Sequence, residues 1–118
     1  MLLNITSGAA LVGQPARAAY SASKAAVDRL SEALAAEEAD AGVRVHAVAP
    51  GVVDTTMQET IRGVDERVWP DRERFVHLHR QGKLTSPGHV ADWLAAIAFD
   101  PVHRPAEVVT RIPDEHPR

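Results

Sequence analysis

The fold is decided by the segment Val43-Arg44-Val45-His46-Ala47-Val48-Ala49-Pro50-Gly51. Its β-branched residues and the turn that closes it predict a buried strand. A shorter apolar run at residues 2–6 predicts a first strand, although so short a run does not by itself separate strand from helix. Between them, residues 18–41 are rich in alanine, leucine and glutamate without glycine or proline, which predicts a long helix that stops at Gly42. This order predicts a βαβ unit with two parallel strands and a right-handed crossover.

The rest of the chain extends this unit. Residues 57–62 and 72–81 suit short helices, and a clearer helix begins at Ser86-Pro87 and ends at Asp100. Apolar residues recur along that helix at helical spacing, at Val90, Trp93, Leu94 and Ile97. Residues 107–112 suit a last strand. On the long helix, one face is expected to hold Tyr20, Lys24, Val27, Leu30 and Leu34. We therefore expect an α/β fold of partial Rossmann type, with about three parallel strands and intervening helices.

Composition sets limits on the class of protein. The chain has 118 residues, 45% of them apolar and 25% charged, which suits one ordinary globular domain. The net charge is −3 without a basic stripe, which argues against nucleic acid or an anionic membrane as the main partner. There is no cysteine, so disulfides and thiolate metal sites are excluded. No apolar stretch is long enough to span a bilayer, and the protein is expected to be cytoplasmic.

Three residues near the start combine into a catalytic pattern. Tyr20 and Lys24 lie four residues apart at the start of the long helix, so their side chains project to the same side. A lysine ammonium beside a tyrosine hydroxyl favours the phenolate form, which suits the tyrosine to proton transfer. Ser7 follows the first strand, and in a parallel unit a strand end and the next helix start meet at one rim. The tyrosine-lysine pair alone is more typical of a solvated helix face, so the prediction depends on all three residues.

Three sequence blocks resemble those of the short-chain dehydrogenase/reductase family. They are Asn4-Ile5-Thr6-Ser7-Gly8, Tyr20-Ser21-Ala22-Ser23-Lys24 and the segment from Val43 to Thr55. The family places its catalytic serine after a strand and before the tyrosine, at a spacing similar to the one seen here. The resemblance implies a nicotinamide-dependent oxidoreductase that transfers a hydride between the cofactor and a small-molecule ketone or alcohol.

The resemblance also implies a role for each matched residue. Tyr20 would be the catalytic acid/base, Lys24 would tune it and bind the nicotinamide ribose, and Ser7 would orient the substrate carbonyl. The turn after the second strand would lie along the nicotinamide, with the Val53 backbone and the Thr55 hydroxyl at its carboxamide. The cofactor-binding set is then Tyr20, Lys24, Pro50, Gly51, Val53 and Thr55. A simple strand-ending turn is the alternative explanation for the proline and the glycine.

A branch of the family is indicated by shorter blocks. The segment from Ala49 to Gln58 and the later Gly82-Lys83-Leu84 are similar to the sepiapterin reductase and benzil reductase branch. That branch uses NADPH to reduce a carbonyl beside a second carbonyl or a conjugated ring. The expected cofactor is therefore NADP, with NAD as the alternative.

The irregular middle of the chain corresponds to the variable loop that closes over substrate in this family. Its charged run, Asp65–Arg74, is expected to solvate a loop or short helix. Apolar side chains in the same region either line a substrate pocket or serve as ordinary helix packing; they are Met57, Val68, Trp69, Phe75 and Leu78.

Other polar residues are expected to have no special chemistry. His77 and His79 lie two apart, which on a helix directs them to different faces, so no metal site is expected. His46 is expected to be a partly buried strand residue. Asp114-Glu115 is expected to belong to a solvated tail, although an aspartate near the carboxy terminus grips the substrate in pterin-reducing relatives.

The amino-terminal part of the family pattern has no counterpart in these blocks. A complete member opens with a glycine-rich turn that binds the pyrophosphate, and Gly8 and Gly13 have neither its position nor its spacing. We expect residues 1–118 to be a truncated carboxy-terminal catalytic half, with an exposed strand edge, marginal stability and a tendency to associate. The alternatives to an active enzyme are a catalytically inactive remnant and one half of a split enzyme. A homo-oligomer would form through the helix that begins near Tyr20, which commonly makes the family's subunit interface.

Overall fold

The computed structural model describes residues 1–117 and contains a three-stranded sheet. The strands are β1 (Leu2–Ile5), β2 (Val45–Ala49) and β3 (Val109–Arg111), in the order β1-β2-β3. Both strand pairs are parallel, with Leu2 opposite Val45 and Ala47 opposite Val109. The predicted partial Rossmann-type α/β fold is confirmed, although each strand is shorter than the sequence pattern suggested.

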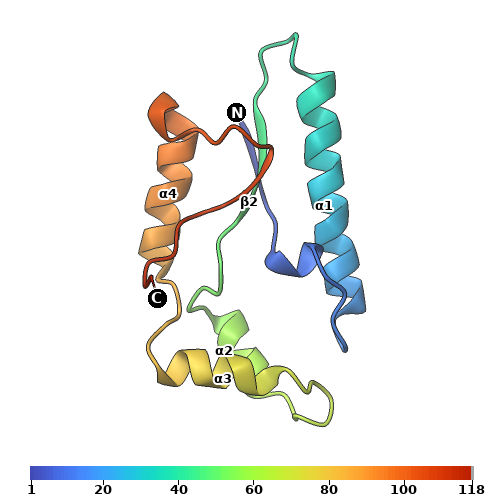
Figure 1. Cartoon of the computed structure of the whole chain (residues 1–118), viewed down its shortest axis with the longest axis vertical. Helices are drawn as coiled ribbons and strands as arrows, with labels where there is room; N and C mark the ends of the chain where they lie inside the picture. Colours follow the sequence, from blue (N-terminus) through green and yellow to red (C-terminus); the bar gives the residue numbers. More distant parts are fainter. Residues whose placement is uncertain (118) are drawn as a thin grey trace.

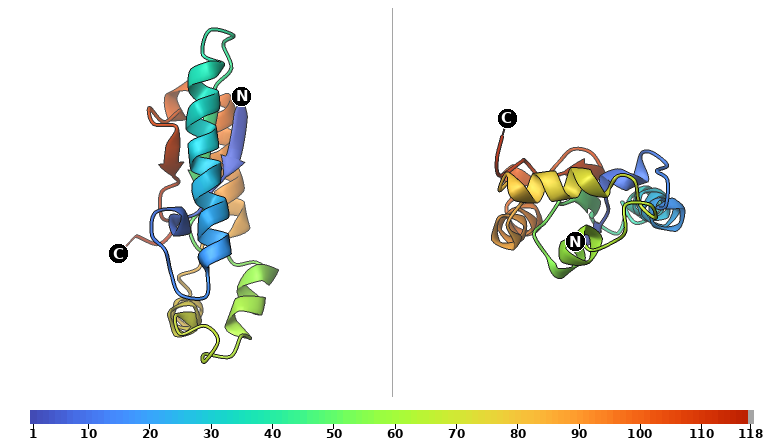
Figure 2. Two further views of the ribbon diagram at one scale, coloured as in Figure 1. Left: turned by 90° about the vertical axis from the view of Figure 1, so that its right-hand side faces the viewer. Right: turned by 90° about the horizontal axis from the view of Figure 1, so that it is seen from below.

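Two helices flank the sheet, one on each side. Helix α1 (Ala18–Glu37) joins β1 to β2, and α4 (Pro87–Phe99) lies on the opposite side of the strands (Figure 1). Two short helices, α2 (Thr56–Arg62) and α3 (Arg72–Arg80), lie beyond the carboxyl ends of β1 and β2, below the sheet in the left view of Figure 2. The 3-10 turns η1 (Gly8–Ala10) and η2 (Pro101–His103) complete the described elements. No helix of residues 1–117 combines the length and apolar character needed to cross a membrane.

The hydrophobic core lies between the sheet and α4. Val48, Ile97 and Ile112 are its buried members, each at most 4% exposed. The apolar residues packed against them are Leu3, Val90, Trp93 and Leu94. All four apolar positions predicted on α4 therefore belong to this core. The predicted N-cap is also present, since the Ser86 hydroxyl accepts a hydrogen bond from the His89 backbone at 3.2 Å.

The residues that α1 itself buries are polar, whereas the neighbouring strand β2 buries Val45 and Ala47. The buried residues of α1 are Ser21, Asp28 and Ser31, whereas Leu30 is 55% exposed. A hydrogen bond of 2.9 Å from the Asn4 side chain to the Ser31 hydroxyl joins β1 to this face. Leu30 therefore faces away from the sheet, and Ser21, Asp28 and Ser31 are the residues that α1 buries.

The helix also ends earlier than predicted. It stops at Glu37 rather than at residue 41, and a turn follows in which the Gly42 amide donates to the Ala39 carbonyl at 3.0 Å. Gly42 adopts a φ of +74°, which glycine reaches without a steric penalty. The predicted stop is therefore the residue that reverses the chain toward β2.

The carboxy-terminal tail is fastened to the molecule rather than simply solvated. The Glu115 carboxylate accepts hydrogen bonds from the Ser86 backbone at 2.6 Å and from its hydroxyl at 2.8 Å. These bonds hold the pKa of the Glu115 carboxyl below its usual range, the backbone bond most strongly. The tail is thus tied to the N-terminus of α4, and the prediction of a free tail is wrong at this residue. His46 is buried in β2, with Nδ1 at 3.0 Å from the Glu107 carbonyl.

Candidate active site

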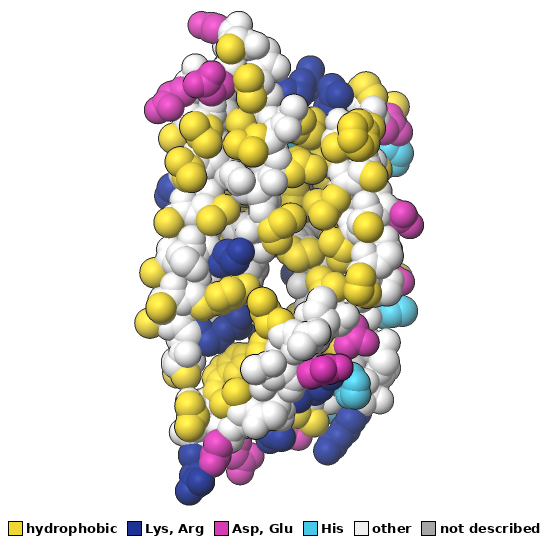
Figure 3. Space-filling view, turned by 180° about the vertical axis from the view of Figure 1, so that it is seen from behind, with side chains coloured by type: hydrophobic (Ala, Val, Ile, Leu, Met, Phe, Trp, Pro, Cys, Tyr) yellow, Lys and Arg dark blue, Asp and Glu magenta, His cyan; other side chains and the backbone are white. Residues whose placement is uncertain are grey.

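A cavity of about 400 Å³ opens where β1 and β2 end, between the start of α1 and the pair α2 and α3. Figure 3 shows the hollow on the back of the molecule, with Lys and Arg side chains at its edge. Its volume falls in the range of small-molecule sites. The position also agrees with the rule that open parallel sheets bind ligands beyond the carboxyl ends of their strands. We therefore take this cavity as the candidate active site.

Ser7, Tyr20 and Lys24 all line this cavity. The Lys24 ammonium lies 5.9 Å from the centre of the Tyr20 ring and donates to the Ile5 carbonyl at 2.9 Å. This bond anchors the lysine to the end of β1. The Ser7 hydroxyl accepts from the Ala9 amide at 3.2 Å as the cap of η1, which leaves its own proton free to be donated. The βα connection thus brings the three residues together at one rim.

The turn after β2 forms another part of the wall. Pro50, Gly51, Val53 and Thr55 all line the cavity. Gly51 has a φ of +81°, a conformation that favours glycine and that suits a tight turn. An isolated parallel bridge pairs Val53 with Thr85. Its hydrogen bonds, of 2.8 and 2.9 Å, use the Val52 carbonyl and the Asp54 amide.

That hydrogen-bond pattern leaves polar groups available at the cavity. Within residues 1–117, the amide and carbonyl of Val53 take part in no hydrogen bond. Thr55 is the N-cap residue of α2, yet its hydroxyl makes no capping bond. The Gln58 Oε1 atom is buried without a partner on the same wall. A ligand carrying both donors and acceptors, such as a carboxamide, matches this set of groups.

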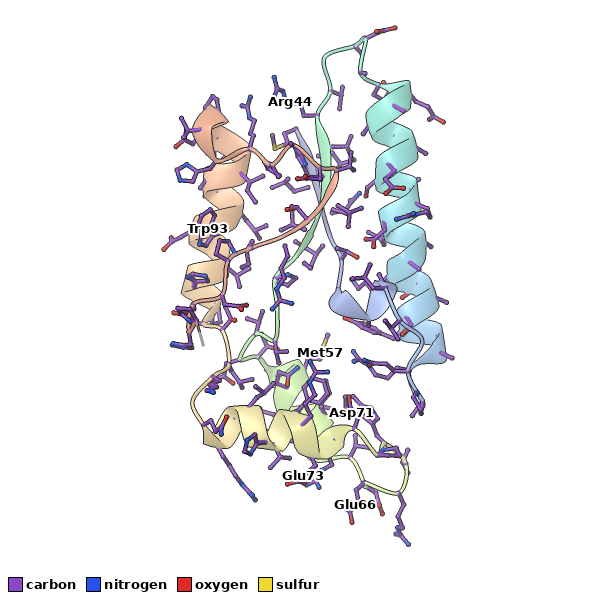
Figure 4. All side chains as sticks on the ribbon, in the orientation of Figure 1. Arg44, Met57, Glu66, Asp71, Glu73 and Trp93 are labelled. Carbon is purple, nitrogen blue, oxygen red and sulfur yellow. The ribbon has the colours of Figure 1, made fainter. Side chains whose placement is uncertain are left out.

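The candidate pocket residues occupy different places. Met57 and Phe75 line the cavity, and Met57 projects from α2 toward the strand ends (Figure 4). Trp69 is absent from the lining. It is 6% exposed and packs against Phe75, with ring centres 5.0 Å apart. Val68 is 65% exposed. The region is therefore partly pocket wall and partly ordinary packing.

Several polar residues of the cavity were not predicted from the sequence. Arg17, Arg74 and Arg111 lie on its wall, as do Gln14 and Gln58. Arg74 belongs to a charged run that is typical of a solvated segment, and Arg111 belongs to the last strand. Arg17 was the easiest of these to find, because it precedes Tyr20 by three residues at the start of the helix. No group of three or more His, Asp or Glu residues in the described part of the chain could hold a metal ion.

Comparisons with known proteins show the family of the chain. The sequence profile of the family described as "short chain dehydrogenase" matches residues 1–65, more than half of the chain. The chain belongs to the short-chain dehydrogenase family. The matched residues contain the strand-helix-strand unit, the serine, tyrosine and lysine, and the turn after β2. The family prediction is thereby confirmed.

Individual relatives are oxidoreductases of several kinds. The chain is 39% identical to the benzil reductase ((S)-benzoin forming) of Bacillus cereus over 76% of its own length. It is 39% identical to the 3-oxoacyl-[acyl-carrier-protein] reductase of Synechocystis sp. and 35% identical to the 4-formylbenzenesulfonate dehydrogenase of Comamonas testosteroni, each over 85% of its length. It spans 37%, 37% and 39% of these three relatives. The chain thus spans less than half the length of each of these relatives.

Proposed function

We propose that this chain carries the proton-transfer and nicotinamide-end site of an oxidoreductase that interconverts a ketone or aldehyde and an alcohol. The observation that carries the proposal is that Ser7, Tyr20 and Lys24 line one cavity together with the turn after β2. A nicotinamide cofactor, when bound, supplies or removes the hydride. Residues on the cavity wall transfer the proton, orient the substrate and bind the nicotinamide end of the cofactor.

The side chains divide the proton work between them. The Tyr20 hydroxyl donates the proton to the substrate oxygen as a carbonyl is reduced, and accepts it when the reaction runs in reverse. The Ser7 hydroxyl, whose proton is free, holds the substrate oxygen within reach of Tyr20. The Lys24 ammonium lies 5.9 Å from the centre of the Tyr20 ring, and we propose that it acts on this tyrosine and on the cofactor ribose.

The wall also suits the nicotinamide end of the cofactor. The unpaired Val53 backbone groups and Thr55 hydroxyl, with the buried Gln58 Oε1, offer donors and acceptors for a carboxamide. The Lys24 ammonium would reach the ribose hydroxyls. We propose NADP as the cofactor, with NAD as the alternative, because the benzil and sepiapterin reductase branch uses NADPH.

The finer choice of reaction follows from the same branch. Two benzil reductases of Bacillus species are 39% and 36% identical to the chain, and benzil is a diketone by its chemistry. We propose that compounds with a carbonyl beside a second carbonyl or a conjugated ring are substrates. Diketones and pterins are therefore the first compounds to screen with NADPH.

Cofactor binding tests the proposal most directly, with cofactor fluorescence as the readout. NADPH is expected to bind saturably in the micromolar range, more tightly than NADH. Lys24→Ala should weaken binding, whereas Lys83→Ala should leave it unchanged, because Lys83 is exposed and outside the cavity. Absence of binding at millimolar NADPH would favour the inactive remnant.

We also propose that α1 forms the surface of a homo-oligomer. Its outward face is rich in alanine and exposes Leu30. Sedimentation of the wild-type chain and of a Leu30→Glu variant tests this. A monomer in both cases would refute the proposal.

A further inference from the structure

The cavity wall is strongly and unevenly charged. Four of its lining residues are basic, and none is aspartate or glutamate; the four are Arg17, Lys24, Arg74 and Arg111. Charges of one sign around a concave site raise the local concentration of counter-ions. The wall therefore favours an anionic ligand over a neutral one.

Two of the four basic side chains form ion pairs with carboxylates that do not line the cavity. Arg74 lies 3.8 Å from the Asp71 carboxylate, and Arg111 lies 2.9 Å from that of Asp114. Lys24 is committed to the Ile5 carbonyl and, under the proposed function, to the cofactor ribose. Within residues 1–117, Arg17 forms no ion pair with any carboxylate. Arg17 is therefore the basic residue of the wall that has no role in the proposed reaction.

Arg17 is held in position by neutral groups. Its guanidinium lies 4.8 Å from the centre of the Tyr20 ring, 5.3 Å from Trp69 and 5.9 Å from Phe75. Nη1 donates to the Gln14 side chain at 2.9 Å. These contacts orient the group without cancelling its charge. A guanidinium has five N–H donors in a planar fork, so most remain free for a carboxylate or sulfonate.

The start of α1 adds to the same potential. Arg17 is its N-cap residue, and the first turn contains no acidic residue. Helix starts favour negative charge, and acidic side chains are common there. Here a cation occupies the position instead, next to the residue proposed to move the proton.

We infer that Arg17 selects carbonyl substrates that bear a carboxylate or sulfonate group. This inference rests on the proposed function for the reacting group, but not for the binding of the anion. The guanidinium lies 4.8 Å from the centre of the Tyr20 ring, so we expect a bound anion to lie near the reacting carbonyl. Compounds in which one aromatic ring separates the anion from the carbonyl are therefore the first to test.

The binding test needs neither cofactor nor turnover. Benzoate, benzenesulfonate and neutral benzamide are titrated into the chain by calorimetry. Both anions should bind about 10- to 100-fold more tightly than benzamide, the range given by a hydrogen bond to a charged group. A difference between benzoate and benzenesulfonate identifies the preferred anion. Equal binding of all three would overturn the inference.

Variants separate this role from simple packing against the aromatic rings. Arg17→Gln should abolish the preference for anions, and Arg17→Lys should keep part of it by retaining charge without the fork. Arg29→Gln is the matched control, because Arg29 pairs with Glu32 at 3.0 Å and its side chain is 70% exposed. If Arg17→Gln lowers the melting temperature but leaves the preference intact, Arg17 has a packing role and the inference is wrong. If Arg17→Gln does not fold, the Arg17→Lys preference decides.

Kinetics then tie the anion site to the reaction. The value of kcat/KM with NADPH is compared between 4-formylbenzoate, 4-formylbenzenesulfonate and methyl 4-formylbenzoate. The anions should be preferred, mainly through KM, and Arg17→Gln should remove this preference. Anion binding that depends on Arg17 without turnover of any substrate would sink the proposed function and leave the anion site standing. Equal turnover of the anionic and the neutral substrates would support the proposed function and refute the anion site.

Discussion

The two sides of the sheet are built from different chemistry. On the α4 side, Ile97 packs with Val48 and Ile112 in an apolar core, and the helix is capped by Ser86 and Glu115. On the α1 side, the buried residues are small or polar, and the helix begins at Arg17 without a side-chain cap. The start of α1, at Arg17, Tyr20 and Lys24, lies on the wall of the candidate site. The comparison indicates that α4 supplies stability and that the start of α1 supplies chemistry.

Substitution of Tyr20 should produce the largest effect, and it should be confined to activity. Tyr20→Phe removes only the hydroxyl, so turnover is expected to fall about 100- to 10,000-fold, the usual contribution of a general acid. The melting temperature should change little, because Tyr20 is only partly buried. Steady-state kinetics with the best substrate found in the screen measure the first effect, and thermal unfolding measures the second. Unchanged turnover would show that the proton has another source.

Truncation of a core side chain on α4 should lower the stability of the fold, in contrast to Tyr20→Phe. Ile97→Ala leaves a cavity among Val48, Ile112 and the α4 stripe, which should lower the free energy of unfolding by about 2 to 5 kcal/mol. Leu30→Ala is the matched control on α1, where the side chain is 55% exposed, and little change is expected at a protein concentration at which the chain sediments as a monomer. Urea denaturation of both variants makes the comparison. Equal losses would show that the two sides do not differ as described.

A buried carboxylate offers the sharpest test of the α1 side. Asp28 is 3% exposed, and its Oδ1 has no hydrogen-bond partner. An unsatisfied buried acceptor costs about 1 to 3 kcal/mol, and more when charged, so Asp28→Ala should raise the free energy of unfolding. Asp40→Ala is the control, since Asp40 is exposed in the turn after α1. A loss of stability in Asp28→Ala would mean that the carboxylate is used in the fold.

Sequence patterns predicted one of these sides far better than the other. The packed residues of α4, from Val90 to Ile97, were predictable because apolar side chains that recur at helical spacing form one face, and that face packs against the core. On α1 the spacing of apolar residues did not indicate which side chains are buried: these are Ser21, Asp28 and Ser31, and Leu30 is exposed. Hydrogen bonds such as that from Asn4 to Ser31 decide this packing, and they depend on the register of strand and helix.

The candidate site divides in a similar way. Ser7, Tyr20 and Lys24 were predictable because one βα connection brings all three to the same rim. Arg74 and Arg111 come from α3 and β3, and their arrival at the cavity depends on long-range packing that no local pattern encodes. The tail bond from Ser86 to Glu115 spans 29 residues and was missed for the same reason.

The smallest effect is expected at that tail bond, and it depends on pH. The hydrogen bonds from Ser86 lower the pKa of the Glu115 carboxyl in the folded chain, so the charged form stabilises the fold. This contribution is present at neutral pH and is lost as the pH falls through the lowered value, below the ordinary pKa of about 4.3 for glutamate. Glu115→Gln should therefore lower the melting temperature at pH ~7 by less than Ile97→Ala does, and the difference from wild type should disappear at low pH. Glu66→Gln is the control, because within residues 1–117 Glu66 is exposed and makes no side-chain hydrogen bond or ion pair. If the difference in melting temperature between Glu115→Gln and wild type persists in acid, the packing of the Glu115 side chain and not its charge stabilises the fold. A charged cap would then not distinguish the start of α4 from the start of α1.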